Sequence, residues 1–126
     1  AMESLSAQNI STHDLVRKLM GGMPGRLNKD AAKGLDAVLQ FDLMGEGGGN
    51  FAIIIKDQTC QIEEQVSANP SAVVKMSTDT YIDLALGKVT GSQAFYKRKV
   101  KLSGGLNLII KMHTLFPSLS KDEQHL

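Results

Sequence analysis

Two strand-like segments on either side of a glycine-rich stretch constrain this fold more than any other feature. From Ala37 to Leu43 the apolar residues occupy every second position, which places them on one face of an extended chain. Gly45–Asn50 holds four glycines between this segment and Phe51–Lys56, whose residues are apolar on both faces, and predicts a turn. The pattern predicts an antiparallel meander with four strands, at Ala37–Leu43, Phe51–Lys56, Thr59–Glu64 and Ala72–Met76.

Helical spacing of apolar residues precedes and follows this block. Ser11 and Thr12 are good N-cap types, and Gly21 with Gly22 ends the helix that they begin. Later runs end at Gly87 and Pro117. We therefore expect an α+β domain whose five-stranded, mostly antiparallel sheet is covered on one face by helices. The further elements are helices from Thr12 to Met20, Ser77 to Leu86, Thr90 to Tyr96 and Leu106 to Phe116, and a fifth strand at Lys99–Leu102.

Length and charge narrow the function. The 126 residues suit one domain, which we place at 12–117, with 1–11 as a disordered or cloning-derived N-terminus and 118–126 as a polar tail. Fourteen basic residues against thirteen acidic ones argue against a nucleic-acid partner. The longest apolar run, Phe51–Ile55, is too short to cross a bilayer, and no secretory signal is visible. These features predict a cytoplasmic location.

The residues that carry chemistry are scattered. His13, His113 and His125 lack partners at metal-ligand spacing, so neither a metal nor a cofactor is predicted. Cys60 has no cysteine partner and is expected to pack as a small core residue. A thiol enzyme or hydrolase that uses Cys60 or His113 remains the alternative from another functional class. The glycine run lies between strands and does not open a helix, so we interpret it as a hairpin loop rather than a phosphate cradle.

A basic cluster and an unusually apolar helix each allow more than one functional interpretation. The basic cluster Lys97, Arg98, Lys99 and Lys101 is typical of a solvated strand edge, or of a contact with anionic lipid head groups or a coenzyme-A phosphate. The helix predicted at Leu106–Phe116 is apolar on more than one side and must be covered on more than one side. A second subunit, a long apolar ligand and ordinary core packing would each cover it.

Four segments together resemble one known family. They are Phe41–Gly49 followed by Phe51, Tyr81–Val89, Gln93–Phe95 and Lys99–Gly104. In this order and spacing they are similar to the sterol carrier protein-2 (SCP2) family, over nearly the whole domain. The resemblance implies an apolar tunnel between sheet and helices, and the binding and transfer of lipids without catalysis. Long-chain fatty acids and fatty acyl-CoA are the expected ligands, with sterols and phospholipids as further candidates.

The resemblance and the apolar pattern also predict the binding residues. Arg98 stands where the family usually has glycine, and His113 stands near the tunnel's inner end, where many members have glutamine. The chain ends in Gln124-His125-Leu126 rather than Ser-Lys-Leu, which makes a peroxisomal location less expected than a cytoplasmic one. The predicted ligand-binding residues are Phe41, Phe51, Ile53, Ile55, Tyr81, Leu84, Phe95, Leu102, Leu106, Ile109, Ile110, Met112 and His113.

The sequence thus predicts a lipid carrier that is not an enzyme, with a transient contact to anionic membranes. The alternative is an accessory domain that presents an acyl chain to a fused or partner enzyme. In either case the helix after Gly104 and Gly105 is expected to move when a ligand enters, because a closed apolar pocket admits no bulky lipid.

Overall fold

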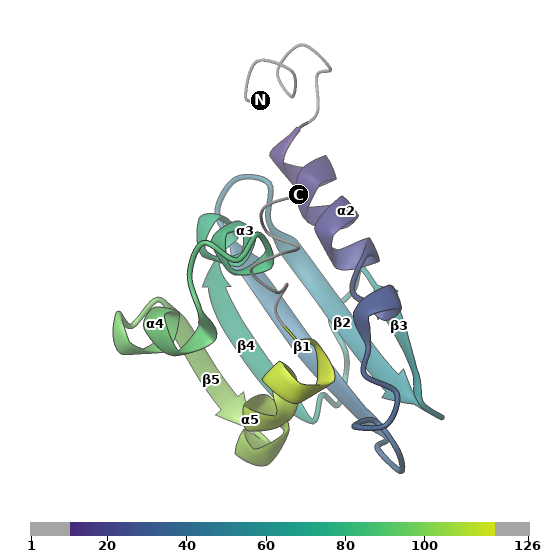
Figure 1. The fold of residues 1–126 in the computed structure, drawn as a ribbon. Coiled ribbons are helices and arrows are strands. Elements are labelled where there is room, and N and C mark those ends of the chain that lie inside the picture. Colours follow the sequence, from purple (N-terminus) through teal and green to yellow (C-terminus); the bar gives the residue numbers. More distant parts are fainter. Residues whose placement is uncertain (1–10, 118–126) are drawn as a thin grey trace.

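A five-stranded sheet with helices on one face forms the domain. The computed structural model describes residues 11–117, so the predictions for 1–10 and 118–126 lie outside the described residues. The strand order is β3-β2-β1-β4-β5, and Figure 1 shows the helices in front of the sheet. The strands are β1 (Ala37–Met44), β2 (Gly49–Lys56), β3 (Thr59–Glu63), β4 (Ala72–Ser77) and β5 (Val100–Gly104); the helices are α2 (Thr12–Gly21), the 3-10 turn η1 (Pro24–Arg26), α3 (Thr78–Ala85), α4 (Gly91–Tyr96) and α5 (Leu106–Leu115).

Local signals place the helix starts where the sequence predicts them. The Ser11 hydroxyl accepts a hydrogen bond from the Asp14 amide at 3.0 Å, and the Ser77 hydroxyl accepts one from the Thr80 amide at 3.1 Å. Thr90 and Gln93 form a reciprocal capping box at the start of α4. Each cap satisfies an amide that a helix leaves unpaired in its first turn.

The strand order corrects the predicted meander at one point. β1, β2 and β3 do form consecutive antiparallel hairpins, but β4 pairs with β1, in parallel, with Leu39 opposite Ala72. The chain between β3 and β4 therefore crosses the sheet. Because apolar alternation fixes which face a residue occupies but not which strands are neighbours, the sequence pattern could not distinguish these two arrangements.

A buried glutamine anchors this crossover. Gln40 lies on the sheet face opposite the helices and is only 2% exposed. Its amide nitrogen donates to the Gln65 carbonyl at 3.1 Å, and its amide oxygen accepts from the Ser67 amide at 2.8 Å. The crossover segment thus covers the middle of the face that the helices leave open.

The glycine-rich stretch is a hairpin turn that packs against two helices. Gly45 and Gly47 have positive φ values of 98° and 79°. A Cβ at Gly47 would lie 2.6 Å from the Thr12 Cβ, and one at Gly48 would lie 2.7 Å from the Thr78 hydroxyl. Larger residues would separate this turn from α2 and α3, so the glycines serve close packing. The prediction of a turn is confirmed.

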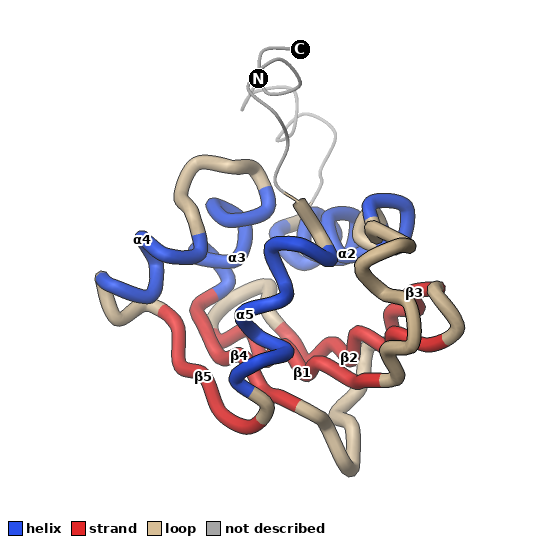
Figure 2. Tube along the Cα trace, turned by 60° about the horizontal axis from the view of Figure 1, so that its bottom comes forward, coloured by secondary structure: helices blue, strands red, loops and turns tan. Residues whose placement is uncertain are grey.

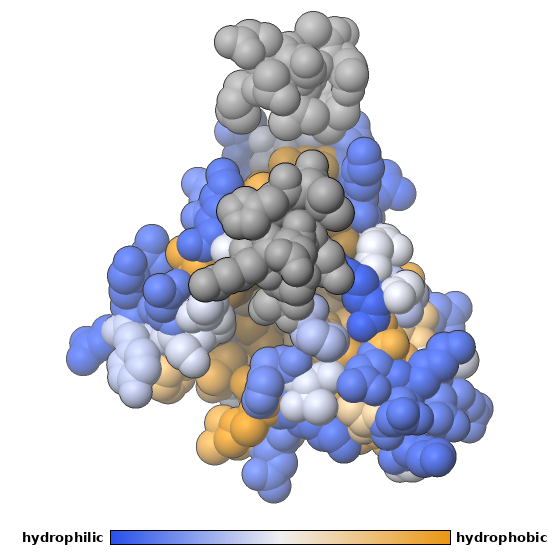
Figure 3. All heavy atoms as spheres, viewed as in Figure 1, coloured by the Kyte–Doolittle hydropathy of each residue, from blue (hydrophilic) through white to orange (hydrophobic). Residues whose placement is uncertain are grey.

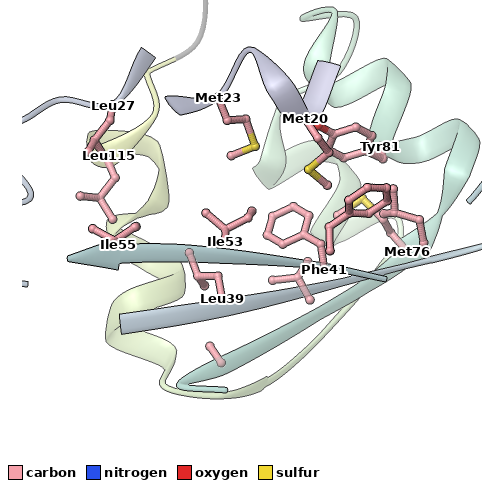
Figure 4. Close-up of a cluster of buried hydrophobic side chains, with 14 of the residues drawn as sticks. Met20, Met23, Leu27, Leu39, Phe41, Ile53, Ile55, Met76, Tyr81 and Leu115 are labelled. Carbon is pink, nitrogen blue, oxygen red and sulfur yellow. The ribbon is translucent and has the colours of Figure 1, made fainter. Parts of the chain in front are cut away.

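The core lies between the sheet and the helix layer. Figure 2 shows α2, α3 and α5 on the same side of the sheet. Figure 4 shows Met20, Met23, Tyr81 and Leu115 pointing from the helix layer toward apolar side chains of the strands. The largest fully buried apolar side chains are Phe51, Met20, Leu39, Ile53, Ile55, Leu115 and Val16.

Candidate functional site

The candidate site is the apolar layer between the helices and the sheet. Alternate residues of the neighbouring strands β1 and β2 form much of its floor, because successive side chains of a strand point to opposite faces. The helix layer forms its roof, with Met20 from α2, Tyr81 from α3 and Leu115 from α5 (Figure 4). The floor includes Leu39, Phe41 and Leu43 from β1, Phe51, Ile53 and Ile55 from β2, and Ala72, Val74 and Met76 from β4.

One polar atom is buried in this layer. Tyr81 packs edge-on against Phe41, with ring centroids 6.2 Å apart and an interplanar angle of 88°. Its hydroxyl is buried, and among the described residues no group forms a hydrogen bond with it. Burial raises the pKa of Tyr81 to about 12, although the positive charge of Arg26 lowers it in part. The hydroxyl therefore remains a protonated donor at physiological pH.

The structure brings most of the predicted binding residues together. Phe41, Phe51, Ile53, Ile55 and Tyr81 are buried in the apolar layer, and Leu84, Leu102, Ile109 and Met112 are partly buried against it. Phe95, Leu106, Ile110 and His113 are exposed. The Nδ1 atom of His113 lies 2.6 Å from the Ile110 carbonyl oxygen of its own helix. His113 is thus exposed on α5, whereas the resemblance implies a position near the inner end of a tunnel.

Helix α5 differs from the expectation that it is covered on more than one side. Leu115 is fully buried, and its carbonyl accepts a hydrogen bond from the Asn28 amide at 2.8 Å. Leu106 and Ile110, however, are 58% and 57% exposed. Figure 3 shows apolar surface near the bottom of the view, where Figure 1 places α5. Only one apolar side of α5 therefore packs on the domain.

An ionic cluster that sequence reasoning missed joins α2 to two loops. The His13 ring nitrogens lie 3.2 Å from the Gly47 carbonyl oxygen and 3.0 Å from a Glu64 carboxylate oxygen. The Arg17 Nε atom lies 3.2 Å from the other oxygen of Glu64. The hydrogen bond to Gly47, supported by the charge of Glu64, raises the pKa of His13. Glu64 lies 51 residues beyond His13 in the sequence, so only the fold brings its carboxylate to the two α2 side chains.

The candidate nucleophile and metal ligands have no catalytic setting in the described chain. Cys60 is half-buried, and burial raises the pKa of its thiol to about 11. A thiol with this pKa is protonated at neutral pH and is a poor nucleophile. Within residues 11–117, no three His, Cys, Asp or Glu side chains gather closely enough to hold a metal ion.

Comparison with known proteins gives the family. The profile of the SCP-2 sterol transfer family matches residues 18–117. This chain belongs to that family. The α+β fold and the resemblance to the SCP2 family that the sequence predicts are thereby confirmed.

Relatives and solved structures with this fold include both chains of similar length and much longer chains. A bovine (Bos taurus) hydroxysteroid dehydrogenase-like protein 2 is 33% identical over 95 residues, which are 75% of this chain and 23% of that protein. The chain thus spans about a quarter of the length of that relative. The palmitated SCP2L2 of Aedes aegypti matches with a TM-score of 0.67 at 19% identity, over 81% of this chain and 94% of that one. The sec-alkylsulfatase Pisa1 from Pseudomonas sp. matches with a TM-score of 0.65 at 21% identity, over 78% of this chain and 16% of that one.

The part of the chain that the structure describes contains no helix of the length and apolar character that a bilayer crossing requires.

Proposed function

We propose that this domain binds a long-chain lipid in the apolar layer and carries it without catalysis, with fatty acids and fatty acyl-CoA as the preferred ligands. The single observation behind this proposal is the buried Tyr81 hydroxyl, which has no hydrogen-bond partner among the described residues. A buried polar group without a partner is unfavourable, so its presence in an apolar layer favours a ligand that supplies an oxygen. The palmitated Aedes aegypti protein, which shares the fold, supports this assignment.

The energetics are consistent with an alkyl chain as the bound group. Burial of each methylene contributes about 0.8 kcal/mol, and micromolar affinity corresponds to about 8 kcal/mol. Part of a long chain is therefore sufficient. The aliphatic and methionine side chains of the layer, such as Met20 and Met23, adapt readily to such a ligand.

Titration of the delipidated protein with a fluorescent fatty acid tests this proposal. We expect saturable binding at micromolar concentration or below, and native mass spectrometry of the purified protein should reveal a co-purifying lipid. Absence of saturable binding on protein shown to be folded by circular dichroism would refute it.

The exposed side of α5 is the proposed contact with the membrane from which a ligand is collected. Ile110 lies on this side, whereas Val66 is similarly exposed but belongs to the crossover segment on the other face of the sheet. Ile110→Asp should slow lipid uptake from vesicles and leave the affinity for dispersed fatty acid unchanged. Val66→Asp is the matched control and should change neither. Equal uptake rates for the two variants would exclude α5 as the contact.

A second candidate function follows from the length of the relatives, which extends well beyond the matched region. Because the bovine relative is about four times as long as the matched region, the domain in such proteins accompanies another part of the chain. In that setting it would present a bound acyl chain to an enzyme. A carrier exchanges lipid between donor and acceptor vesicles, whereas a presenting domain binds lipid without accelerating exchange, so a vesicle transfer assay separates the two.

A further inference from the structure

A hollow with a basic lining lies apart from the apolar layer. It has a volume of about 450 Å³ and is bounded by the ends of β1 and β4, by α3 and by the start of β5. Lys75 and Lys101 lie at register positions on the sheet face opposite the core residues Val74 and Met76. The lining residues are Met44, Lys75, Ser77, Asp79, Thr80, Asp83, Arg98, Lys99 and Lys101.

Two features of this hollow are unfavourable for the unliganded protein. Lys75 stands directly opposite Lys101 in the antiparallel pair of β4 and β5. Like charges at directly opposed positions destabilise a sheet. Arg98 directly follows the C-cap of α4 and has a φ of 59°, the left-handed conformation that ends many helices and favours glycine over a residue with a side chain.

Protection of a sheet edge does not explain the arrangement. Lysines on an edge strand discourage pairing with other chains, and this accounts for Lys99 and Lys101 near β5. Lys75, however, lies on β4, between β1 and β5. Among residues 11–117, neither Lys75 nor Arg98 takes part in an ion pair. Edge protection therefore does not account for these two charges.

We propose that this hollow binds the phosphate group of a phosphate ester, with Lys75, Arg98, Lys99 and Lys101 as its cationic contacts. A bound phosphate would screen the Lys75–Lys101 repulsion, and the Arg98 guanidinium offers the paired donors that match phosphate oxygens. The hollow is several times larger than one inorganic phosphate and includes the half-exposed apolar side chain of Met44. An ester that carries an organic group fits these features better than the free ion does.

Two carboxylates line the same hollow and provide a test that distinguishes anion binding from cation binding. Asp79 and Asp83 lie one turn apart on α3, and neither is ion-paired with the four cations. They oppose the binding of an anion without abolishing the excess of positive charge. Replacing either by asparagine should therefore tighten phosphate binding, which is the reverse of the effect expected if the hollow bound a cation.

The source of the phosphate is either a soluble ester or a phospholipid head group, and both can be tested on the full chain. The soluble arm titrates ¹⁵N-labelled protein with glycerol 3-phosphate and follows the amide signals of Lys75, Arg98 and Lys101. The membrane arm measures co-sedimentation with phosphatidylglycerol vesicles against phosphatidylcholine vesicles. Binding in the first arm identifies a soluble ester, and binding in the second arm alone identifies a head group. Absence of binding in both arms overturns the proposal.

Two variants separate a built site from general electrostatic attraction. Lys75→Gln and Arg98→Gly each remove a locally unfavourable feature, so both should keep or raise the midpoint of thermal unfolding. Each should nevertheless weaken binding by about three- to tenfold at low salt. The control is Lys56→Gln, because Lys56 is an exposed lysine at the end of β2, outside the hollow. If Lys56→Gln weakens binding as much as Lys75→Gln does, or if Asp79→Asn weakens it, the hollow is not the site. Because this site lies outside the apolar layer, its failure would leave the proposed lipid binding untouched.

Discussion

Replacing Tyr81 by phenylalanine should change stability and lipid affinity in opposite directions. The substitution removes only the hydroxyl and keeps the ring that packs edge-on against Phe41. A buried hydroxyl without a partner costs about 1–3 kcal/mol. For the delipidated protein we therefore expect Tyr81→Phe to raise the free energy of unfolding by about 1–2 kcal/mol, with a rise of several °C in melting temperature.

The expected effect on binding follows from the same atom. If Tyr81 donates to a ligand oxygen, its loss removes a hydrogen bond of about 1 kcal/mol for a neutral acceptor and about 1.5–3 kcal/mol for a carboxylate. The dissociation constant for a fatty acid should then rise by about 10- to 100-fold. Because burial raises the pKa of Tyr81 to about 12, this difference should be constant between pH 6 and pH 9.

Urea denaturation and fluorescent fatty-acid titration of the delipidated proteins measure the two effects. Tyr96→Phe is the matched control, since Tyr96 is 84% exposed and its hydroxyl is not buried. That variant should match the parent protein in both assays. If Tyr81→Phe were destabilising, or if it bound fatty acid with unchanged affinity, the hydroxyl would not be the polar contact and the reasoning would be wrong.

Three further predictions concern residues at other positions. Leu115→Ala should lower the free energy of unfolding in urea by about 2–5 kcal/mol, because Leu115 is fully buried, whereas Ile110→Ala on the exposed side should change it by less than about 1 kcal/mol. His13 has a raised pKa because it bonds to the Gly47 carbonyl, so its stabilising contribution is complete at pH 5.5 and is lost as the pH rises through the folded-state pKa. The free energy of unfolding in urea should therefore decline between pH 5.5 and pH 8, and His13→Gln should remove this decline. An unchanged decline in the variant would show that His13 is not its source. Cys60→Ala should leave fatty-acid affinity within a few-fold, and iodoacetamide should label the native thiol slowly at pH 7.5 because its pKa is raised to about 11; a thioesterase activity that disappears in this variant would contradict the absence of catalysis.

The sequence predicts the elements of this fold well because their signals are local. Apolar alternation from Ala37 onward, the N-cap at Ser11 and the capping box at Thr90 each depend on neighbouring residues only. The parallel pairing of β1 with β4 joins distant residues instead, and Gln40, which bonds to the crossover before β4, resembles a surface residue of a half-buried strand. Its burial becomes evident only when the crossover segment lies against it.

For the candidate sites too, features that depend on local sequence could be predicted and features that depend on distant contacts could not. Tyr81 and the strand residues of the apolar layer could be predicted from alternation, helical spacing and the family resemblance. The lack of a partner for the Tyr81 hydroxyl among the described residues and the charge of Arg26 could not be predicted, because they depend on where the fold places α3 and η1. Likewise, Arg98, Lys99 and Lys101 form a visible cluster in the sequence, whereas Lys75 joins them only through the pairing of β4 with β5.

The position of β1 between an antiparallel and a parallel neighbour has a consequence for folding. The β1–β2 and β2–β3 hairpins join nearby residues and can form early, whereas the pairing of Leu39 with Ala72 requires closure of a long loop. Loss of the Gln40 anchor should therefore accelerate unfolding more than it slows folding. During synthesis, at roughly 5–20 residues per second, one edge of β1 remains unpaired for on the order of seconds after its hairpin is complete. Over that interval the nascent chain exposes a central strand to other chains and to chaperones.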